Sequence, residues 1–88
     1  MKVAYLKKFS KDLDKIKQSK DHRTILEIIE LVKQVQDINE VPGTKKLKGY
    51  EDAFRIRLGD YRIGVFVSEG WVEFARIAHR KDIYKIFP

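Results

Sequence analysis

The chain has 88 residues, enough for one domain, and its 19 lysines and arginines exceed its 13 aspartates and glutamates to give a formal net charge of +6. The lack of cysteine excludes disulfides, and two histidines argue against a structural zinc site. No apolar run approaches the roughly 20 residues that cross a bilayer, and the N-terminus does not resemble a signal peptide, so we expect a cytoplasmic protein. The charge favours a polyanionic partner such as RNA, DNA or an acidic protein.

The first half of the chain predicts one strand and two helices. Apolar residues alternate over Lys2–Leu6, which predicts a strand, and Ser10 is a candidate N-cap for a short helix. Asp21 is a candidate N-cap for a longer helix over His22–Ile38, and the short connection between the helices predicts a helical hairpin. We expect the following apolar residues to face inward: Phe9, Leu13, Ile16, Ile25, Ile28, Ile29, Val32 and Val35.

The second half changes to the two-residue period that is typical of strands. Turn signals at Gly59-Asp60 and Glu69-Gly70 separate its longest alternating runs. We expect strands over Lys45–Lys48, Phe54–Leu58, Tyr61–Val67 and Trp71–Ala78, followed by a basic and aromatic tail. The element order predicts a single α+β domain over residues 1–88. It consists of an N-terminal strand, a two-helix hairpin and a three- to four-stranded antiparallel sheet, with the helices packed on one face.

Counting outward from the Gly59-Asp60 turn separates the flanking side chains onto two faces. Arg57 pairs with Arg62, and Arg55 pairs with Gly64. The opposite, apolar face contains Phe54, Ile56, Leu58, Tyr61, Ile63 and Val65. Two arginines directly opposite each other repel, and arginine forks bind phosphate oxygens bidentately, so the outer face predicts an anion site. The alternative is a solvated face whose charges are paired with acids from the tail such as Asp82.

The same counting across the second hairpin gives further expectations. It places Arg62 opposite Ile77 and puts His79 on the arginine face. Gly64 and the small residue opposite it would leave a shallow floor beside the arginines, where a sugar or base could approach. Arg76 would fall on the core face unless a β-bulge shifts this strand.

Several residues are candidates for chemistry, and each has a structural alternative. Histidine is the side chain whose ordinary chemistry suits proton transfer near neutral pH, so His79 is a candidate for this role, unless it only closes the last strand with a hydrogen bond. Arg80 either reaches a phosphate or solvates the chain end. Tyr84 either stacks on a base, moves a proton, or packs in the core with its apolar neighbours. The basic run Lys45, Lys46 and Lys48 either contacts a nucleic-acid backbone or forms a solvated loop.

The residues of three segments, Lys45–Gly49, Phe54–Gly64 and His79–Tyr84, resemble the RelE branch of the RelE/ParE toxin superfamily. The resemblance covers essentially the whole chain and is strongest to archaeal RelE-like proteins. It implies a type II toxin that enters the ribosomal A site and cleaves mRNA there, which inhibits translation. In that reaction a 2′-hydroxyl attacks the adjacent phosphodiester and leaves a 2′,3′-cyclic phosphate, without a metal or other cofactor. It also implies a cognate antitoxin that wraps and neutralises the toxin.

The resemblance also implies roles for individual residues. Arg62 and Arg80 match the family's phosphate and transition-state arginines, and Tyr84 matches its tail tyrosine. Arg55 and Arg57 stand where bacterial relatives often carry lysine. Because arginine stays protonated, it can stabilise developing charge but cannot act as a base. The candidates for moving protons are therefore His79 and Tyr84, and those for gripping ribosomal RNA are Lys45, Lys46 and Lys48.

Two alternatives stay open at the level of sequence. A ParE-like toxin on the same fold would inhibit DNA gyrase by binding and would cleave nothing. An inactive member would bind its antitoxin and do nothing further. All three hypotheses share the predicted fold, and primer extension on mRNA from expressing cells separates the first two.

Overall fold

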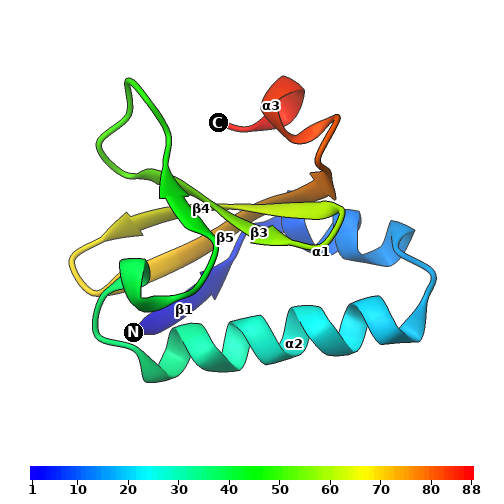
Figure 1. Ribbon diagram of the computed structural model, residues 1–88, viewed down its shortest axis with the longest axis horizontal. Helices are drawn as coiled ribbons and strands as arrows, with labels where there is room; N and C mark the ends of the chain where they lie inside the picture. The colour runs from blue at the N-terminus through cyan, green and yellow to red at the C-terminus, as the bar shows by residue number, and fades with distance from the viewer.

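A five-stranded sheet forms the centre of the computed structural model, which describes residues 1–88 (Figure 1). Its strand order is β1-β5-β4-β3-β2, and β1 pairs with β5 in parallel while every other pair is antiparallel. The elements are β1 (Lys2–Tyr5), α1 (Lys7–Lys15), α2 (Ser19–Gln34), η1 (Ile38–Glu40), β2 (Thr44–Lys46), β3 (Ala53–Leu58), β4 (Tyr61–Ser68), β5 (Trp71–His79) and α3 (Ile83–Ile86). The predicted α+β order is confirmed, and the sheet gains a fifth strand because β1 joins its edge.

Both long helices begin earlier than predicted. Helix α1 starts directly after β1, and the carbonyl of Leu6 accepts the N–H groups of Phe9 and Ser10 at 3.0 and 3.3 Å. Ser10 therefore lies within the helix and does not cap it. Helix α2 has Gln18 at its N-cap, so Asp21 lies in its first turn. The positive end of the helix dipole stabilises a carboxylate at this position.

Helix α2 ends at Gln34, four residues before the predicted Ile38. The amino group of Met1 donates to three carbonyls at this end, those of Val32 and Lys33 in the helix and of the C-cap residue Val35, at 3.2, 3.0 and 2.8 Å. Asp37 then caps the short helix η1 by accepting the N–H of Asn39 at 2.8 Å. Ile38 is buried in this separate turn, which explains why its apolar side chain continued the helical pattern. None of the helices combines the length and apolar character that crossing a membrane requires.

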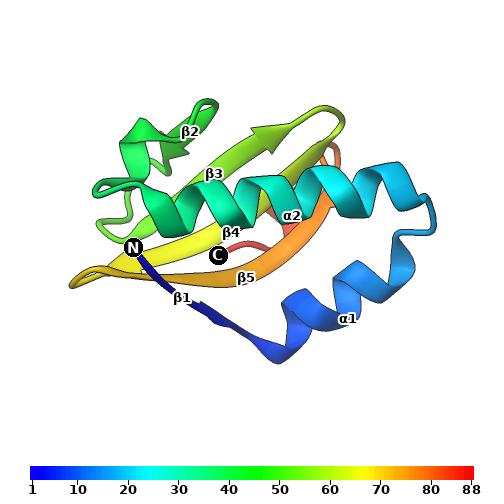
Figure 2. The ribbon, with the colours of Figure 1, turned by 90° about the horizontal axis from the view of Figure 1, so that it is seen from below.

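The main core lies between the sheet and the two long helices, which cover the same face (Figure 2). The register of the β3–β4 hairpin is as predicted: Arg57 opposite Arg62 and Arg55 opposite Gly64. The core residues that are 2% exposed or less are Phe9, Ile25, Val32, Ile38, Val41, Ile56, Ile63, Val65, Val72 and Phe74. The alternating pattern of β3 and β4 thus specifies which face meets the helices.

A β-bulge between Gly64 and Val65 shifts the second hairpin by one residue. Gly64 pairs with Arg76, and Arg62 pairs with Ala78, so the prediction that Arg62 lies opposite Ile77 was wrong. The shift moves the Arg76 guanidinium out of the apolar core and puts Ile77, only 3% exposed, in its place. Burying an unpaired charge is far more unfavourable than a local break in the strand ladder, so the bulge is the stable solution.

The first long helix closes the part of β5 that β1 leaves open. Strand β1 pairs only with Trp71–Phe74, and beyond that point Oδ2 of Asp12 accepts the N–H of Ile77 at 3.1 Å. The same carboxylate binds Arg76 with both oxygens, at 2.8 Å to Nε and 3.1 Å to Nη2. The hydrogen bond that Arg76 donates to Asp12 raises the pKa of Arg76 above its usual value, although burial partly opposes this effect. Asp12 therefore joins α1 to the strand through three hydrogen bonds.

The tail covers the outer face of the sheet, opposite α2 (Figure 1). It contributes Ile83 and Phe87 to a second, smaller cluster with Ala53 and Ala75. The Phe87 ring lies so close to Gly64 that a Cβ at this glycine would meet three ring carbons at 2.4 to 2.7 Å. The shallow floor expected at Gly64 is therefore wrong, because Phe87 fills it.

Candidate functional site

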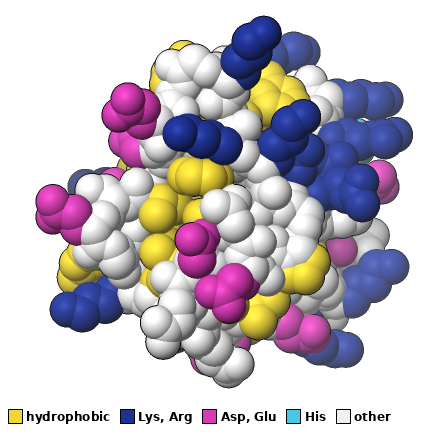
Figure 3. Space-filling model, turned by 60° about the vertical axis from the view of Figure 1, so that its left-hand side comes forward, with side chains coloured by type: hydrophobic (Ala, Val, Ile, Leu, Met, Phe, Trp, Pro, Cys, Tyr) yellow, Lys and Arg dark blue, Asp and Glu magenta, His cyan; other side chains and the backbone are white.

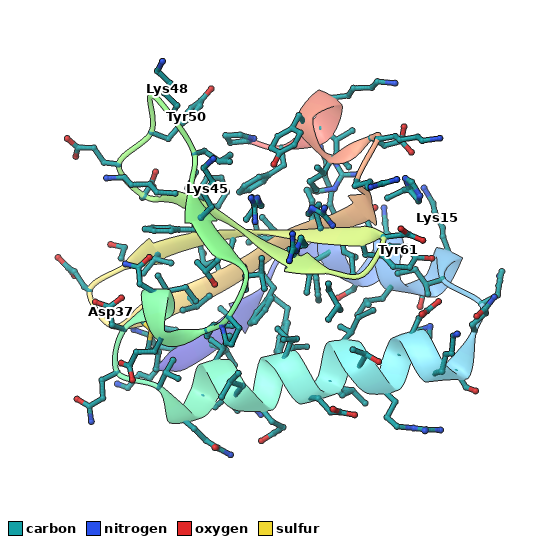
Figure 4. The ribbon with its side chains drawn as sticks, in the orientation of Figure 1. Lys15, Asp37, Lys45, Lys48, Tyr50 and Tyr61 are labelled. Carbon is teal, nitrogen blue, oxygen red and sulfur yellow. The ribbon has the colours of Figure 1, made fainter.

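The outer face of β3 and β4 gathers the three predicted arginines. Arg57 and Arg62 are direct cross-strand partners, and Arg55 is paired with Lys45 on β2. Side chains at such positions are roughly 5 Å apart at their Cβ atoms. Figure 4 shows Lys45 on β2, with the arginine-bearing strands beside it. The fold thus brings four cationic side chains from three adjacent strands together.

Arg55 is positioned by the backbone of Gly43. Its Nη1 donates to the carbonyl of Gly43 at 2.7 Å, and the same carbonyl accepts the N–H of Arg57 at 3.0 Å. Gly43 has a φ of +82°, and a Cβ there would lie 3.1 Å from the carbonyl oxygen of Arg57. Nε of Arg55 is buried and has no hydrogen-bond partner. Gly43 and Arg55 are 12 residues apart, so no local sequence pattern indicates this contact.

Arg62 and Arg80 lie beside the same turn. Nη1 of Arg62 donates to the carbonyls of Gly59 and Tyr61, both at 2.8 Å. The backbone N–H of Arg80 donates to the carbonyl of Asp60 at 2.7 Å, which fixes the start of the tail against the turn. Arg80 is exposed. The β3–β4 turn therefore holds one arginine by its side chain and the other by its backbone.

None of the candidate cations is neutralised by a carboxylate of the protein. The ion pairs within 4 Å are Lys33–Glu30, Arg76–Asp12 and Lys85–Asp82. Asp82, the acid considered as a partner for the arginines, lies 3.7 Å from Lys85 instead. Figure 3 shows lysines and arginines gathered at the upper right of the view, whereas most aspartates and glutamates lie on its left and in its lower half. The unrelieved repulsion among these cations favours an anion over this surface.

His79 lies on the other side of the sheet. It pairs with Tyr61, and both line a hollow of about 380 Å³ with Leu58 and the first residues of α2. Its Nδ1 accepts the N–H of Lys81 at 3.2 Å. The prediction that His79 shares the arginine face was wrong, because the bulge turns every later side chain of β5 to the opposite face. Figure 4 shows Tyr61 at the end of the sheet that is distant from Lys48.

Tyr84 and the lysines extend from the outer side of the molecule. Tyr84 is 60% exposed on α3, so the alternative that it packs in the core was wrong, whereas its neighbours Ile83 and Phe87 are buried. Lys46 is exposed on the edge strand β2, and Lys48 lies at the tip of the loop that follows (Figure 4). Tyr50 lies at the same tip and is 49% exposed. The signal for it in the sequence is an aromatic residue two positions after the last lysine of the basic run.

The comparisons with known proteins cover nearly the whole chain. The family model described as the ParE toxin of a type II toxin–antitoxin system matches residues 3–84. Toxin RelE3 of Methanocaldococcus jannaschii is 42% identical over 89 residues, which cover all of both chains. A RelB–RelE antitoxin–toxin complex from Methanococcus jannaschii contains a chain that is 38% identical, with a TM-score of 0.81 over 97% of this chain and 99% of the other. A chain of the archaeal RelE–RelB complex from Pyrococcus horikoshii OT3 shares the fold at 24% identity, with a TM-score of 0.76 over 93% and 97% of the two chains.

Proposed function

Because this chain belongs to the RelE branch of the RelE/ParE superfamily of type II toxins, we propose that it inhibits translation by cleaving mRNA in the ribosomal A site. Its relatives of known structure include toxins solved in complex with antitoxins, which supports a cognate antitoxin as its second partner. The free toxin acts on the ribosome and its mRNA, and the antitoxin suppresses that activity.

The proposed reaction is an internal transfer within the RNA. The 2′-oxygen forms a bond to the adjacent phosphorus, the bond from phosphorus to the 5′-oxygen breaks, and a 2′,3′-cyclic phosphate remains. One proton leaves the 2′-hydroxyl and one is gained by the departing 5′-oxygen. Negative charge accumulates on the phosphorane oxygens, and fixed cations that meet this charge lower the barrier without a metal or other cofactor.

The roles follow from where the side chains lie. Arg55, Arg57 and Arg62 approach the phosphate from the sheet, and Arg80 approaches it from the start of the tail. Guanidinium groups stabilise the phosphorane charge and stay protonated throughout, so the proton is moved by another group. Tyr84, exposed on the outer side, takes that role in our proposal. His79 does not, because it lies across the sheet from the arginines.

Ribosomal RNA would be held by the three exposed lysines of β2 and its loop, Lys45, Lys46 and Lys48. These lysines form no ion pair within the protein, so their charges are available to phosphates. The single observation that carries the proposal is the set of unneutralised arginines on the outer face, two of them directly opposite each other. A polyanion explains this arrangement better than solvent does.

The test uses arginine substitutions on opposite sides of the molecule. We expect Arg62→Ala and Arg80→Ala each to lower the rate at which the toxin cleaves mRNA on purified ribosomes by about 100-fold or more. The melting temperature of both variants should stay close to that of wild type. Arg23→Ala, at an exposed arginine of α2 on the far face, is the matched control and should cleave normally. Full growth inhibition by both Arg62→Ala and Arg80→Ala after induced expression would exclude this surface as the site.

A second candidate function follows from the family model that matches, which describes a ParE toxin. A ParE-like protein would bind DNA gyrase and leave mRNA intact. Primer extension on mRNA from expressing cells separates the two: cuts in phase with ribosomes support the ribonuclease, whereas intact transcripts with a DNA-damage response support the gyrase inhibitor.

A further inference from the structure

The loop between β2 and β3, residues 47–52, presents an aromatic ring at its tip. Tyr50 is 49% exposed there and lies next to Lys48 (Figure 4). The loop surrounds a hollow of about 360 Å³ lined by Lys46, Leu47, Lys48, Gly49, Tyr50 and Glu51. A large aromatic side chain that belongs to neither hydrophobic cluster and lies beside two exposed lysines, with Glu51 on its other side, needs an explanation outside the fold.

The loop is anchored, so the ring is presented in a defined place. The N–H of Leu47 donates to the carbonyl of Ala53 at 2.8 Å, and the N–H of Tyr50 donates to the carbonyl of Leu47 at 3.2 Å. Leu47 packs against the small cluster that contains Phe87. Gly49 supplies the left-handed backbone, φ +88°, that the turn requires. A ligand that contacts Tyr50 therefore does not have to order the loop first.

The tip continues the line of cations on the outer face. Arg57 and Arg62 form the first row, Arg55 and Lys45 form the next, and Lys48 follows beyond the end of β2. Three to five residues at about 3.3 Å each, shortened by the turn from Leu47 to Tyr50, place the tip within roughly 17 Å of the second row. An extended single strand with its phosphate on the arginines would therefore bring a neighbouring base to the loop.

We propose that Tyr50 stacks on a base of the bound mRNA, next to the cleaved linkage, while Lys48 contacts the adjoining phosphate. This inference rests on the proposed ribonuclease function. Aromatic rings between cations bind single-stranded RNA because every base offers a flat π-face while the cations follow the backbone. Tyr50 is a binding residue and takes no part in the chemical step.

A second exposed aromatic residue offers the contrast. Trp71 is 45% exposed, but the hollow beside it is lined by Asp52, Glu69 and Glu73. Phosphates are repelled by this acidic environment, whereas the hollow at Tyr50, lined by Lys46 and Lys48 against the single acid Glu51, keeps a net positive charge that attracts them. Trp71→Ala is therefore the matched control for the loss of an exposed aromatic ring.

The experiment measures cleavage of a defined mRNA in programmed, purified ribosomes as a function of ribosome concentration. We expect Tyr50→Ala to raise KM about 5- to 100-fold with little change in kcat, because the stacked base is held equally before and during the reaction. Tyr50→Phe keeps the ring and should stay close to wild type, as should Trp71→Ala. Thermal unfolding confirms that each variant is folded.

The possible results separate this inference from the function on which it rests. Cleavage by wild type with an unchanged KM for Tyr50→Ala would overturn the role of Tyr50 and leave the ribonuclease proposal standing. No cleavage by wild type would overturn both. Normal cleavage by Tyr50→Ala, together with weaker neutralisation by the antitoxin, would assign the ring to the protein partner and likewise overturn RNA stacking.

Discussion

Replacing Gly64 with alanine tests how the tail is held over the sheet. A Cβ at this position would lie 2.4 to 2.7 Å from carbons of the Phe87 ring, a distance that no packed pair tolerates. Phe87 is only 3% exposed and packs with Ala53, Ala75 and Ile83, so moving the ring away from Gly64 breaks these contacts. We therefore expect Gly64→Ala to lift the end of the tail from the sheet.

The magnitude follows from the burial of one aromatic side chain. Exposing Phe87 removes about 2–3 kcal/mol of stabilisation. Replacing glycine with alanine also restricts the unfolded chain, which stabilises the folded protein by about 0.5 kcal/mol. The net loss of stability is therefore about 2 kcal/mol. For a domain of this size the melting temperature should fall by about 8–16 °C.

A double-mutant cycle isolates the clash. Phe87→Ala alone should be destabilising by about 3 kcal/mol, because it empties most of the small cluster. In that background Gly64→Ala should become neutral or slightly stabilising, since nothing remains above the new methyl group. The coupling energy between the two positions should therefore be about 2.5 kcal/mol, measured by urea denaturation of the four proteins. Equal effects of Gly64→Ala in both backgrounds would show that Phe87 does not occupy the space above the glycine.

Two further predictions concern the contacts that position β5 and Arg55. Asp12→Ala should be destabilising by about 3 kcal/mol, because it leaves the partly buried Arg76 and the N–H of Ile77 without partners, whereas Asp14→Ala on the exposed side of α1 should change stability little. Since Asp12 raises the pKa of Arg76, this stabilisation is fully present below the usual arginine pKa and is lost only as pH rises through the raised pKa, so the Asp12→Ala effect in urea melts should be equal at pH 7 and pH 10. Gly43→Ala should strain the backbone and displace Arg55, so the rate of mRNA cleavage should fall even where most of the variant stays folded. Unchanged cleavage kinetics would contradict the role of Gly43 in positioning Arg55.

The arrangement of the outer face was predictable as far as the first hairpin. A two-residue turn joins strands in which apolar and cationic residues alternate, and a slip by one residue would bury arginines. The same logic identified Arg76 as the residue in conflict with the second hairpin. The side of the sheet on which His79 lies was not predictable, because it depends on where the bulge is placed. Counting residues without the bulge assigns every β5 residue after it, including His79, to the wrong face.

Other features depend on contacts between distant parts of the chain. The amino group of Met1 binds the carbonyls of Val32, Lys33 and Val35 where helix α2 ends, a contact that no local pattern contains. The fit of Phe87 over Gly64 joins residues 23 positions apart, and each alone has an ordinary local interpretation. Tyr84 is exposed while Ile83 and Phe87 in the same tail are buried, a choice that their spacing alone does not decide. Local periodicity thus predicts the elements, and long-range packing decides how the tail covers them.

The open side of β2 has a consequence for how loss-of-function variants are interpreted. This strand is only three residues long, ends the sheet, and carries Lys45 and Lys46. Short edges with lysines resist pairing with strands of other molecules. Replacing these lysines with apolar residues would therefore promote self-association as well as weaken any grip on RNA. Loss of toxicity in a variant at Lys45 or Lys46 is therefore evidence for RNA binding only if light scattering shows that the variant does not aggregate.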